Sequence, residues 1–187
     1  MGTYILVNHL QSSYSQILPD EEREQLIENT NIFVEQARPH VDGVIFAFAF
    51  TENPVTHEPF DLESELPASY SEGDLMLRND GGKGLDHEFL TNLNSVTPNP
   101  DNIILTGLFY DACISGTAIT IKQNIAKTVT VPKDLVDQPD PKESIKHRAL
   151  ATLDMGEAGI TLGKSSGDIL SELKEPQFTL AENTPFT

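Results

Sequence analysis

The sequence predicts one three-layer α/β domain built on an open, mostly parallel sheet. Short runs of β-branched and other apolar residues alternate along the chain with segments in which apolar residues recur every three or four positions. The short runs are apolar on both faces, as expected of strands that helices cover from both sides. The 187 residues with 38% hydrophobic content suit one core, which we assign to residues 1–173, followed by a polar tail at 174–187.

The first half of the chain is predicted to hold three strands and two helices. The strands are expected at residues 4–7, 44–50 and 75–77, and the helices at 19–37 and 85–93. Acidic residues follow Pro19, where the positive end of a helix favours them. Residues 51–73 contain three prolines, several acids and no periodicity, so we expect a long surface loop there.

In the second half, strands are expected at residues 103–107, 128–131 and 159–162. Helices are expected near 114–121, at 141–153 and at 166–173, the last one capped by Ser165 or Ser166. Ligands of such folds bind beyond the carboxyl ends of the strands. His9, Arg78 and the segment 109–113 each follow a predicted strand, so all of them are expected at that edge.

The composition argues against two classes of partner. Lys and Arg total 12 against 29 Asp and Glu, and the net charge of −17 disfavours both nucleic acid and an anionic membrane surface. The longest apolar run, at 44–50, is far shorter than the roughly 20 residues of a membrane helix, and the first nine residues do not resemble a signal peptide. A single cysteine excludes an internal disulfide. We therefore expect a soluble, cytoplasmic protein.

Cys113 is the residue with the clearest chemical potential. It lies where a predicted strand passes into a helix, and the N–H groups at such a junction lower the pKa of a thiol. A thiolate there could attack a carbonyl carbon, while the same N–H groups stabilise the oxyanion. The alternative is a buried structural cysteine that behaves as a small apolar side chain.

The segment 103–118 has Leu-Thr-Gly, five further residues, then Cys, Ile and Thr-Ala, and it resembles the cysteine-bearing signature of the isochorismatase-like hydrolases, which include nicotinamidases. Residues 5–11 resemble the first strand of that family with its terminal Gln, 74–78 its short central strand, and 147–173 its closing strand and helix. The resemblance implies a doubly wound α/β domain that is often oligomeric, so a homo-oligomer is expected. It also implies hydrolysis of small amides, carbamoyl compounds or the vinyl ether of isochorismate.

Active members of that family carry a triad of Asp, Lys and Cys. Cys113 keeps the cysteine, whereas His9 occupies the Asp position and Arg78 the Lys position. Arg supplies positive charge but does not exchange a proton. His9 could act as the base of a Cys-His pair, or it could be a strand-end histidine bonded to a backbone carbonyl. Asn8 is expected to face the opposite side of the strand from His9.

The resemblance also implies that the backbone N–H groups of Phe109 and Cys113 bind the oxyanion. In many relatives a cis peptide bond stands at the position between Leu108 and Phe109. Asp111 matches an acid that often stands two residues before the cysteine, although it could equally be a turn or cap residue.

No metal or cofactor is expected. Nicotinamidases bind a metal through an Asp-x-His motif and further histidines, whereas this chain has only His57 in the corresponding stretch, with Glu52 and Glu58 near it. One imidazole with scattered carboxylates is a weak ligand set. Lys83 could stand in for the missing lysine, but a solvated loop residue is the simpler interpretation.

Two functions follow from these residues. The first is a divergent hydrolase that acts on a small amide-like or related metabolite through Cys113, with His9 moving the proton and Arg78 holding the thiolate or an anionic substrate. The second is an inactive family member that binds a small molecule or serves as an oligomeric scaffold, because two triad positions are changed.

Overall fold

The structure is a computed structural model, and it describes residues 2–11, 15, 18–49, 65–79, 87–137 and 141–175. Most of the predicted loop at 51–73 lies outside the described residues, as do His57, Glu52, Glu58, Lys83 and most of the tail at 174–187.

The described strands form one parallel sheet with the order β3-β2-β1-β4-β5. The strands are β1 (Gly2–Asn8), β2 (Gly43–Phe48), β3 (Leu75–Arg78), β4 (Pro100–Leu108) and β5 (Thr128–Thr130), and the short β6 (Val136–Asp137) also pairs with β4. The chain builds the sheet outward from β1 in one direction and from β4 in the other. The boundary between β1 and β4 is therefore the topological switch point, where α/β folds place their ligands.

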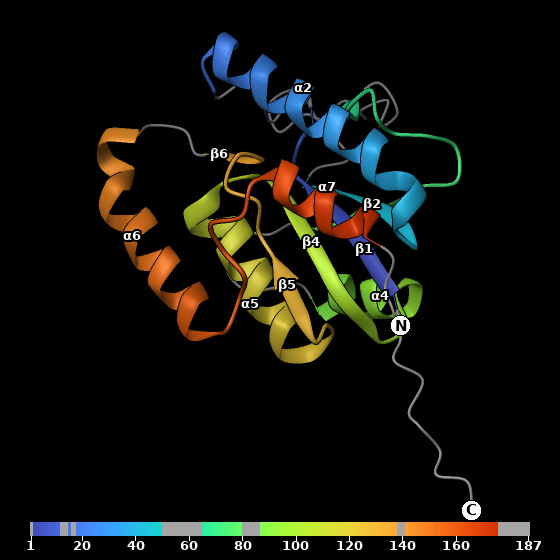
Figure 1. Cartoon of the computed structure of the whole chain (residues 1–187). Helices are drawn as coiled ribbons and strands as arrows, with labels where there is room; N and C mark the ends of the chain where they lie inside the picture. The colour runs from blue at the N-terminus through green and yellow to red at the C-terminus, as the bar shows by residue number, and fades with distance from the viewer. Residues whose placement is uncertain are drawn as a thin grey trace, which may run out of the picture.

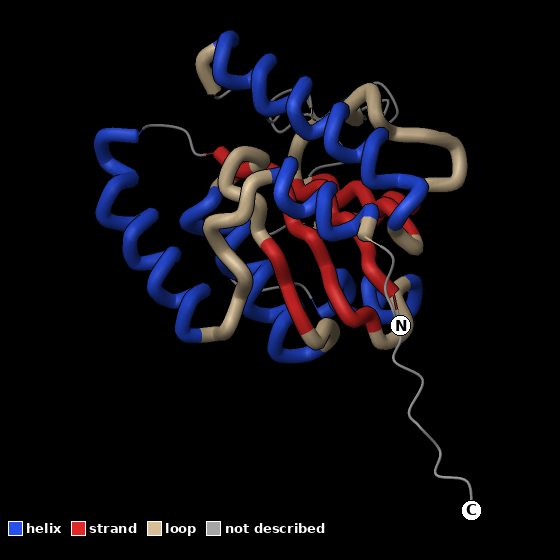
Figure 2. Tube along the Cα trace, in the orientation of Figure 1, coloured by secondary structure: helices blue, strands red, loops and turns tan. Residues whose placement is uncertain are grey.

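Helices cover both faces of the sheet, as Figures 1 and 2 show. On one face lie α2 (Asp20–Ala37) and α7 (Ser166–Lys174), whose Phe33 and Ile169 belong to one core cluster. The other face carries α4 (His87–Val96), α5 (Ser115–Asn124) and α6 (Pro141–Glu157), whose Phe89, Ile121 and Met155 belong to a second cluster. The predicted three-layer α/β architecture is confirmed.

The central strands supply both clusters at once. Ile5 and Ile104 enter the core beside α2 and α7, whereas their neighbours Leu6 and Leu105 enter the core on the other face. All four side chains are fully buried. Successive strand residues point to opposite faces, so a strand with helices on both sides has to be apolar throughout. That requirement explains the continuous apolar runs in the sequence.

The predicted strand at 159–162 is the main correction to the sequence-based fold. The segment makes a single bridge, between Thr161 and Thr130, and the sixth strand of the sheet is β6 instead. Gly159 and Gly163 have φ angles of 74° and 84°. These left-handed turns bend the chain on both sides of the bridge and keep the segment from pairing further.

Of the two serines predicted to cap α7, Ser165 is the N-cap residue. The Ser165 side chain accepts a hydrogen bond from the Asp168 backbone N–H, and the Asp168 carboxylate accepts one from the Ser165 backbone N–H at 2.8 Å. This capping box satisfies two N–H groups that the helix leaves open. The hydrogen bonds from Ser165 hold the pKa of Asp168 below its ordinary value. Within the described part of the chain, no helix is long and apolar enough to span a bilayer.

Candidate active site

The candidate site begins where β1 and β4 end, side by side at the switch point. Asn8 is paired with Gly107, and the next positions along each strand lead to His9 and Phe109. His9 has a φ of 57° and Phe109 a φ of 62°, a left-handed conformation that residues with a side chain rarely adopt. Backbone strain of this kind concentrates at functional sites. The two strained residues at adjacent strand ends therefore point to this edge of the sheet as the candidate functional site.

His9 is buried, with 1% of its surface exposed, and its ring nitrogen Nε2 lies 2.6 Å from the backbone carbonyl oxygen of Asn79. A carbonyl oxygen only accepts hydrogen bonds, so Nε2 carries the proton and donates it. In the neutral ring, Nδ1 then holds the basic lone pair. The structure thus shows the carbonyl partner that one interpretation of His9 expected, while the ring keeps one atom able to take a proton.

Asn79 is the residue that the sequence analysis missed. Its side-chain Nδ2 donates to Oδ1 of Asn8 at 2.9 Å, and its backbone N–H donates to the carbonyl oxygen of Phe48 at 2.8 Å. Both asparagines are fully buried. Asn79 thus contacts both Asn8, through its side chain, and His9, through its backbone carbonyl.

Gln11 ties the same edge to β2. Its side-chain Oε1 accepts a hydrogen bond from the backbone N–H of Ala49 at 2.7 Å, and its side chain is buried. The final Gln of the first motif thus holds the segment after β1 against the end of β2. The buried side chains of Asn8, Gln11 and Asn79 together connect the carboxyl ends of three strands.

Arg78 reaches the predicted edge but in a different environment. It is the last residue of β3, where it pairs with Phe48, and its side chain is exposed. The structure therefore places Arg78 next to Asn79 at the rim of the site, whereas His9 and Cys113 are buried.

Cys113 lies in the turn Tyr110–Ile114, a short π-helical segment between β4 and α5. Only 9% of its surface is exposed. Burial, together with the negative charge of Asp111, raises the pKa of the Cys113 thiol to about 11. The shift is opposite to the lowering expected from the strand-to-helix junction, because desolvation and a nearby carboxylate both penalise the thiolate.

Helix α6 packs against the turn that carries the cysteine. The Arg148 guanidinium lies over the Tyr110 ring, 4.7 Å from its centroid, and the Tyr110 hydroxyl is 2.9 Å from Oγ1 of Thr152. Nδ1 of His147 lies 3.9 Å from a carboxylate oxygen of Asp111. These contacts hold Tyr110 and Asp111, two adjacent residues of the segment between β4 and Cys113, against α6.

The sequence analysis also considered a cis peptide bond and a metal site. The peptide bonds of the described residues are all trans, including the bond between Leu108 and Phe109, where the resemblance implied a cis bond. Among the described residues, no three His, Cys, Asp or Glu side chains are grouped closely enough to hold a metal ion.

Comparison with known proteins identifies the fold. No family model and no curated protein matches the sequence. Solved structures do match, among them an isochorismatase-like hydrolase from Alkaliphilus metalliredigens, with 13% identity, a TM-score of 0.69 and coverage of 92% of this chain and 99% of the other. An isochorismatase family protein from Desulfovibrio vulgaris matches with 16% identity, a TM-score of 0.66 and coverage of 93% and 99%.

An N-carbamoylsarcosine amidase from Thermoplasma acidophilum also matches, with 19% identity, a TM-score of 0.60 and coverage of 89% of this chain and 97% of the other. At identities this low the likeness establishes the fold, and the chemistry has to be argued from the site. The protein therefore has the isochorismatase-like hydrolase fold, and the structural part of the sequence resemblance is confirmed.

Proposed function

We propose that this protein is a hydrolase that cleaves a small amide-like or carbamoyl metabolite with Cys113 as the nucleophile. The observation that carries the proposal is the place of Cys113 at the carboxyl edge of β4, beside the β1 end that holds His9. Solved structures with the same fold include an N-carbamoylsarcosine amidase, which supports this class of substrate.

The raised pKa of Cys113, about 11, makes the thiol protonated at neutral pH. Attack therefore requires a base that takes the proton while the bond forms. In the proposed mechanism this base is Nδ1 of His9. The hydrogen bond from Nε2 to the Asn79 carbonyl oxygen fixes the ring and stabilises the imidazolium that results.

The proposed reaction then has two halves. Sγ of Cys113 bonds to the carbonyl carbon, the carbonyl electron pair moves to oxygen, and the backbone N–H groups of Phe109 and Cys113 receive the oxyanion. The imidazolium of His9 returns its proton to the leaving nitrogen, so an amine or ammonia departs and a thioester remains. Water, deprotonated by His9, hydrolyses the thioester to the acid and restores the thiol.

Arg78 is assigned the recognition of substrate charge. Arg78 is exposed at the rim, and this position suits contact with an anionic group of the substrate better than contact with the buried thiol. Because the chain carries a net charge of −17, an anionic substrate needs such a local cation.

The test is ammonia release from a panel of primary amides, ureas and carbamoyl amino acids at neutral and alkaline pH. We expect the wild type to release ammonia from at least one compound, and Cys113→Ser to lose at least about 100-fold in rate. Absence of release from the whole panel, or equal release by Cys113→Ser, contradicts a cysteine amidase.

The second candidate function is a binding protein that has lost catalysis. Three observations favour it: the raised pKa of Cys113, the bond of His9 to a backbone carbonyl, and the exposure of Arg78. This candidate predicts saturable binding of an amide without turnover, and binding that is unchanged in Cys113→Ser.

A further inference from the structure

Helix α7 covers only part of its face of the sheet. It has nine residues, Ser166–Lys174, and spans about 13 Å at the rise of an α-helix. Strand β4 also has nine residues but extends over about 30 Å. In Figures 1 and 2, α7 crosses the middle of the sheet, and the starts of β1, β4 and β5 lie below it without a helix in front of them.

The sequence turns polar where this cover ends. On the face that α7 packs against, Ile5 of β1 and Ile104 of β4 are buried, but two residues earlier the same face carries Thr3 and Asn102. β5 contributes Thr130 to the same region. These side chains line a hollow of about 330 Å³ at the amino ends of the strands, opposite the edge that carries Cys113.

The charged groups around this hollow are already paired. Nζ of Lys164 lies 2.6 and 2.7 Å from the two carboxylate oxygens of Glu172, and Nζ of Lys127 lies 2.6 Å from the carboxylate of Asp101. A charged ligand would have to break one of these pairs or face an opposing charge. The hollow therefore suits a neutral ligand.

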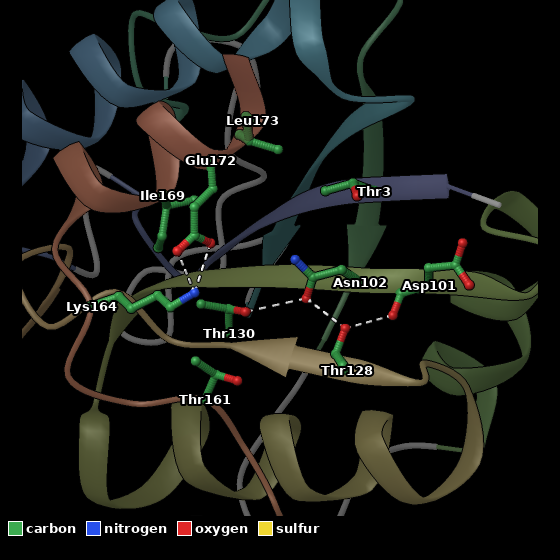
Figure 3. Close-up of a pocket in the computed structure, with 10 residues that line it drawn as sticks. All are labelled: Thr3, Asp101, Asn102, Thr128, Thr130, Thr161, Lys164, Ile169, Glu172 and Leu173. Atoms are coloured by element: carbon green, nitrogen blue, oxygen red, sulfur yellow. Dashed lines mark hydrogen bonds and ion pairs between the residues drawn. The ribbon is translucent and has the colours of Figure 1, made fainter. Parts of the chain in front are cut away.

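Several polar side chains line the hollow. Oδ1 of Asn102 accepts from the hydroxyls of Thr128 and Thr130 at 3.1 and 3.3 Å, and Figure 3 shows its amide nitrogen on the side away from both threonines. Within the described part of the chain, no hydrogen bond engages this nitrogen or the hydroxyls of Thr3 and Thr161. They provide one donor group and two hydroxyls that both donate and accept.

We propose that this hollow binds a neutral, polyhydroxylated small molecule of about monosaccharide size. The sheet wall offers hydroxyl and amide groups to the ligand hydroxyls, and the partly buried Leu173 of α7 offers apolar surface to its C–H groups. The volume is near the lower end of ligand pockets, which run from about 300 to 1,000 Å³. The site stands apart from the proposed catalytic edge and does not depend on its activity.

The test is titration of the ¹⁵N-labelled protein with D-glucose, D-ribose and myo-inositol, followed by amide chemical shifts. We expect saturable shifts that map to residues 128–130 and to α7, from at least one of the three compounds. D-glucose 6-phosphate should bind more weakly than the neutral sugar. Saturable shifts from none of the three, shifts confined to the carboxyl edge, or tighter binding of the phosphate overturn the proposal.

Matched variants locate the contacts. Thr3→Val and Thr161→Val each remove one hydroxyl at nearly constant shape and should weaken binding by about 5-fold, the value of one lost hydrogen bond. Thr91→Val is the control, since Thr91 is exposed on α4 on the other face of the sheet, and it should bind like the wild type. Circular dichroism confirms folding of each variant. Wild-type affinity in both folded variants also overturns the proposal.

Discussion

The ring nitrogen Nε2 of His9 lies 2.6 Å from the backbone carbonyl oxygen of Asn79, which joins the end of β1 to the end of β3 past the intervening β2. This bond fixes the tautomer of a buried histidine beside the strand end that leads to Cys113. It makes His9 a structural residue through one nitrogen and a candidate base through the other.

Replacing His9 by glutamine separates these two roles. The amide of glutamine can donate to the Asn79 carbonyl oxygen in place of Nε2, but it cannot take a proton from a thiol. We expect His9→Gln to fold with a melting temperature close to that of the wild type and to lose about 100-fold or more in hydrolysis rate. Wild-type turnover in this variant contradicts the role of His9 as the base.

The raised pKa of Cys113 predicts a loss of stability at alkaline pH. Because the pKa is about 11 in the folded protein and 9.0 ordinarily, the folded state holds the proton more tightly. The contribution of this shift to the free energy of unfolding is fully present below pH 9. It is lost as the pH rises to about 11, a change of about 2–3 kcal/mol. The free energy of unfolding of the wild type, measured relative to that of Cys113→Ala, should fall by this amount between pH 9 and pH 11. A difference that stays constant with pH contradicts the shift.

Asp111 should contribute to the same shift through its charge. Asp111→Asn removes the negative charge but keeps the shape, so it should lower the pKa of Cys113 and speed alkylation by iodoacetamide at a given pH. Glu24→Gln is the control, because Glu24 is exposed on α2 on the other face of the sheet, and it should leave the rate unchanged. Equal rates for wild type and Asp111→Asn would show that burial alone sets the pKa.

Gly107 should be indispensable to the junction between β1 and β4. It has a φ of 128°, and a Cβ atom there would lie 1.8 Å from the backbone oxygen of Asn8. Gly107→Ala should therefore destabilise the protein by at least about 3 kcal/mol in denaturant unfolding. Gly116→Ala is the matched control, because a Cβ atom at Gly116 in α5 meets nothing within 4 Å, and it should stabilise by about 0.5–1 kcal/mol. Equal effects of the two substitutions contradict this account.

The sequence predicted the layers of the fold because each central strand must be apolar on both faces. Leu6 is buried on one face of the sheet and Ile104 on the other. It failed at 159–162, where two left-handed glycines limit an apolar segment to one bridge. It also missed β6, since two residues are too few to give a periodic signal.

The site was predictable only in part, for a similar reason. Local sequence placed His9, Arg78 and Cys113 at strand ends, but Asn79 acts through its backbone carbonyl and through a partner on another strand. Such contacts depend on the strand order, which the pattern does not encode. The direction of the Cys113 pKa shift likewise depends on burial within the folded turn.

The measurement that tests the central claim most directly is mass spectrometry of acid-quenched reactions between the protein and an amide that it hydrolyses. The account predicts an acyl adduct on the peptide that contains Cys113, absent in Cys113→Ala and formed about 100-fold more slowly in His9→Gln. Turnover that continues in Cys113→Ala, with no adduct on the wild-type cysteine, would contradict it.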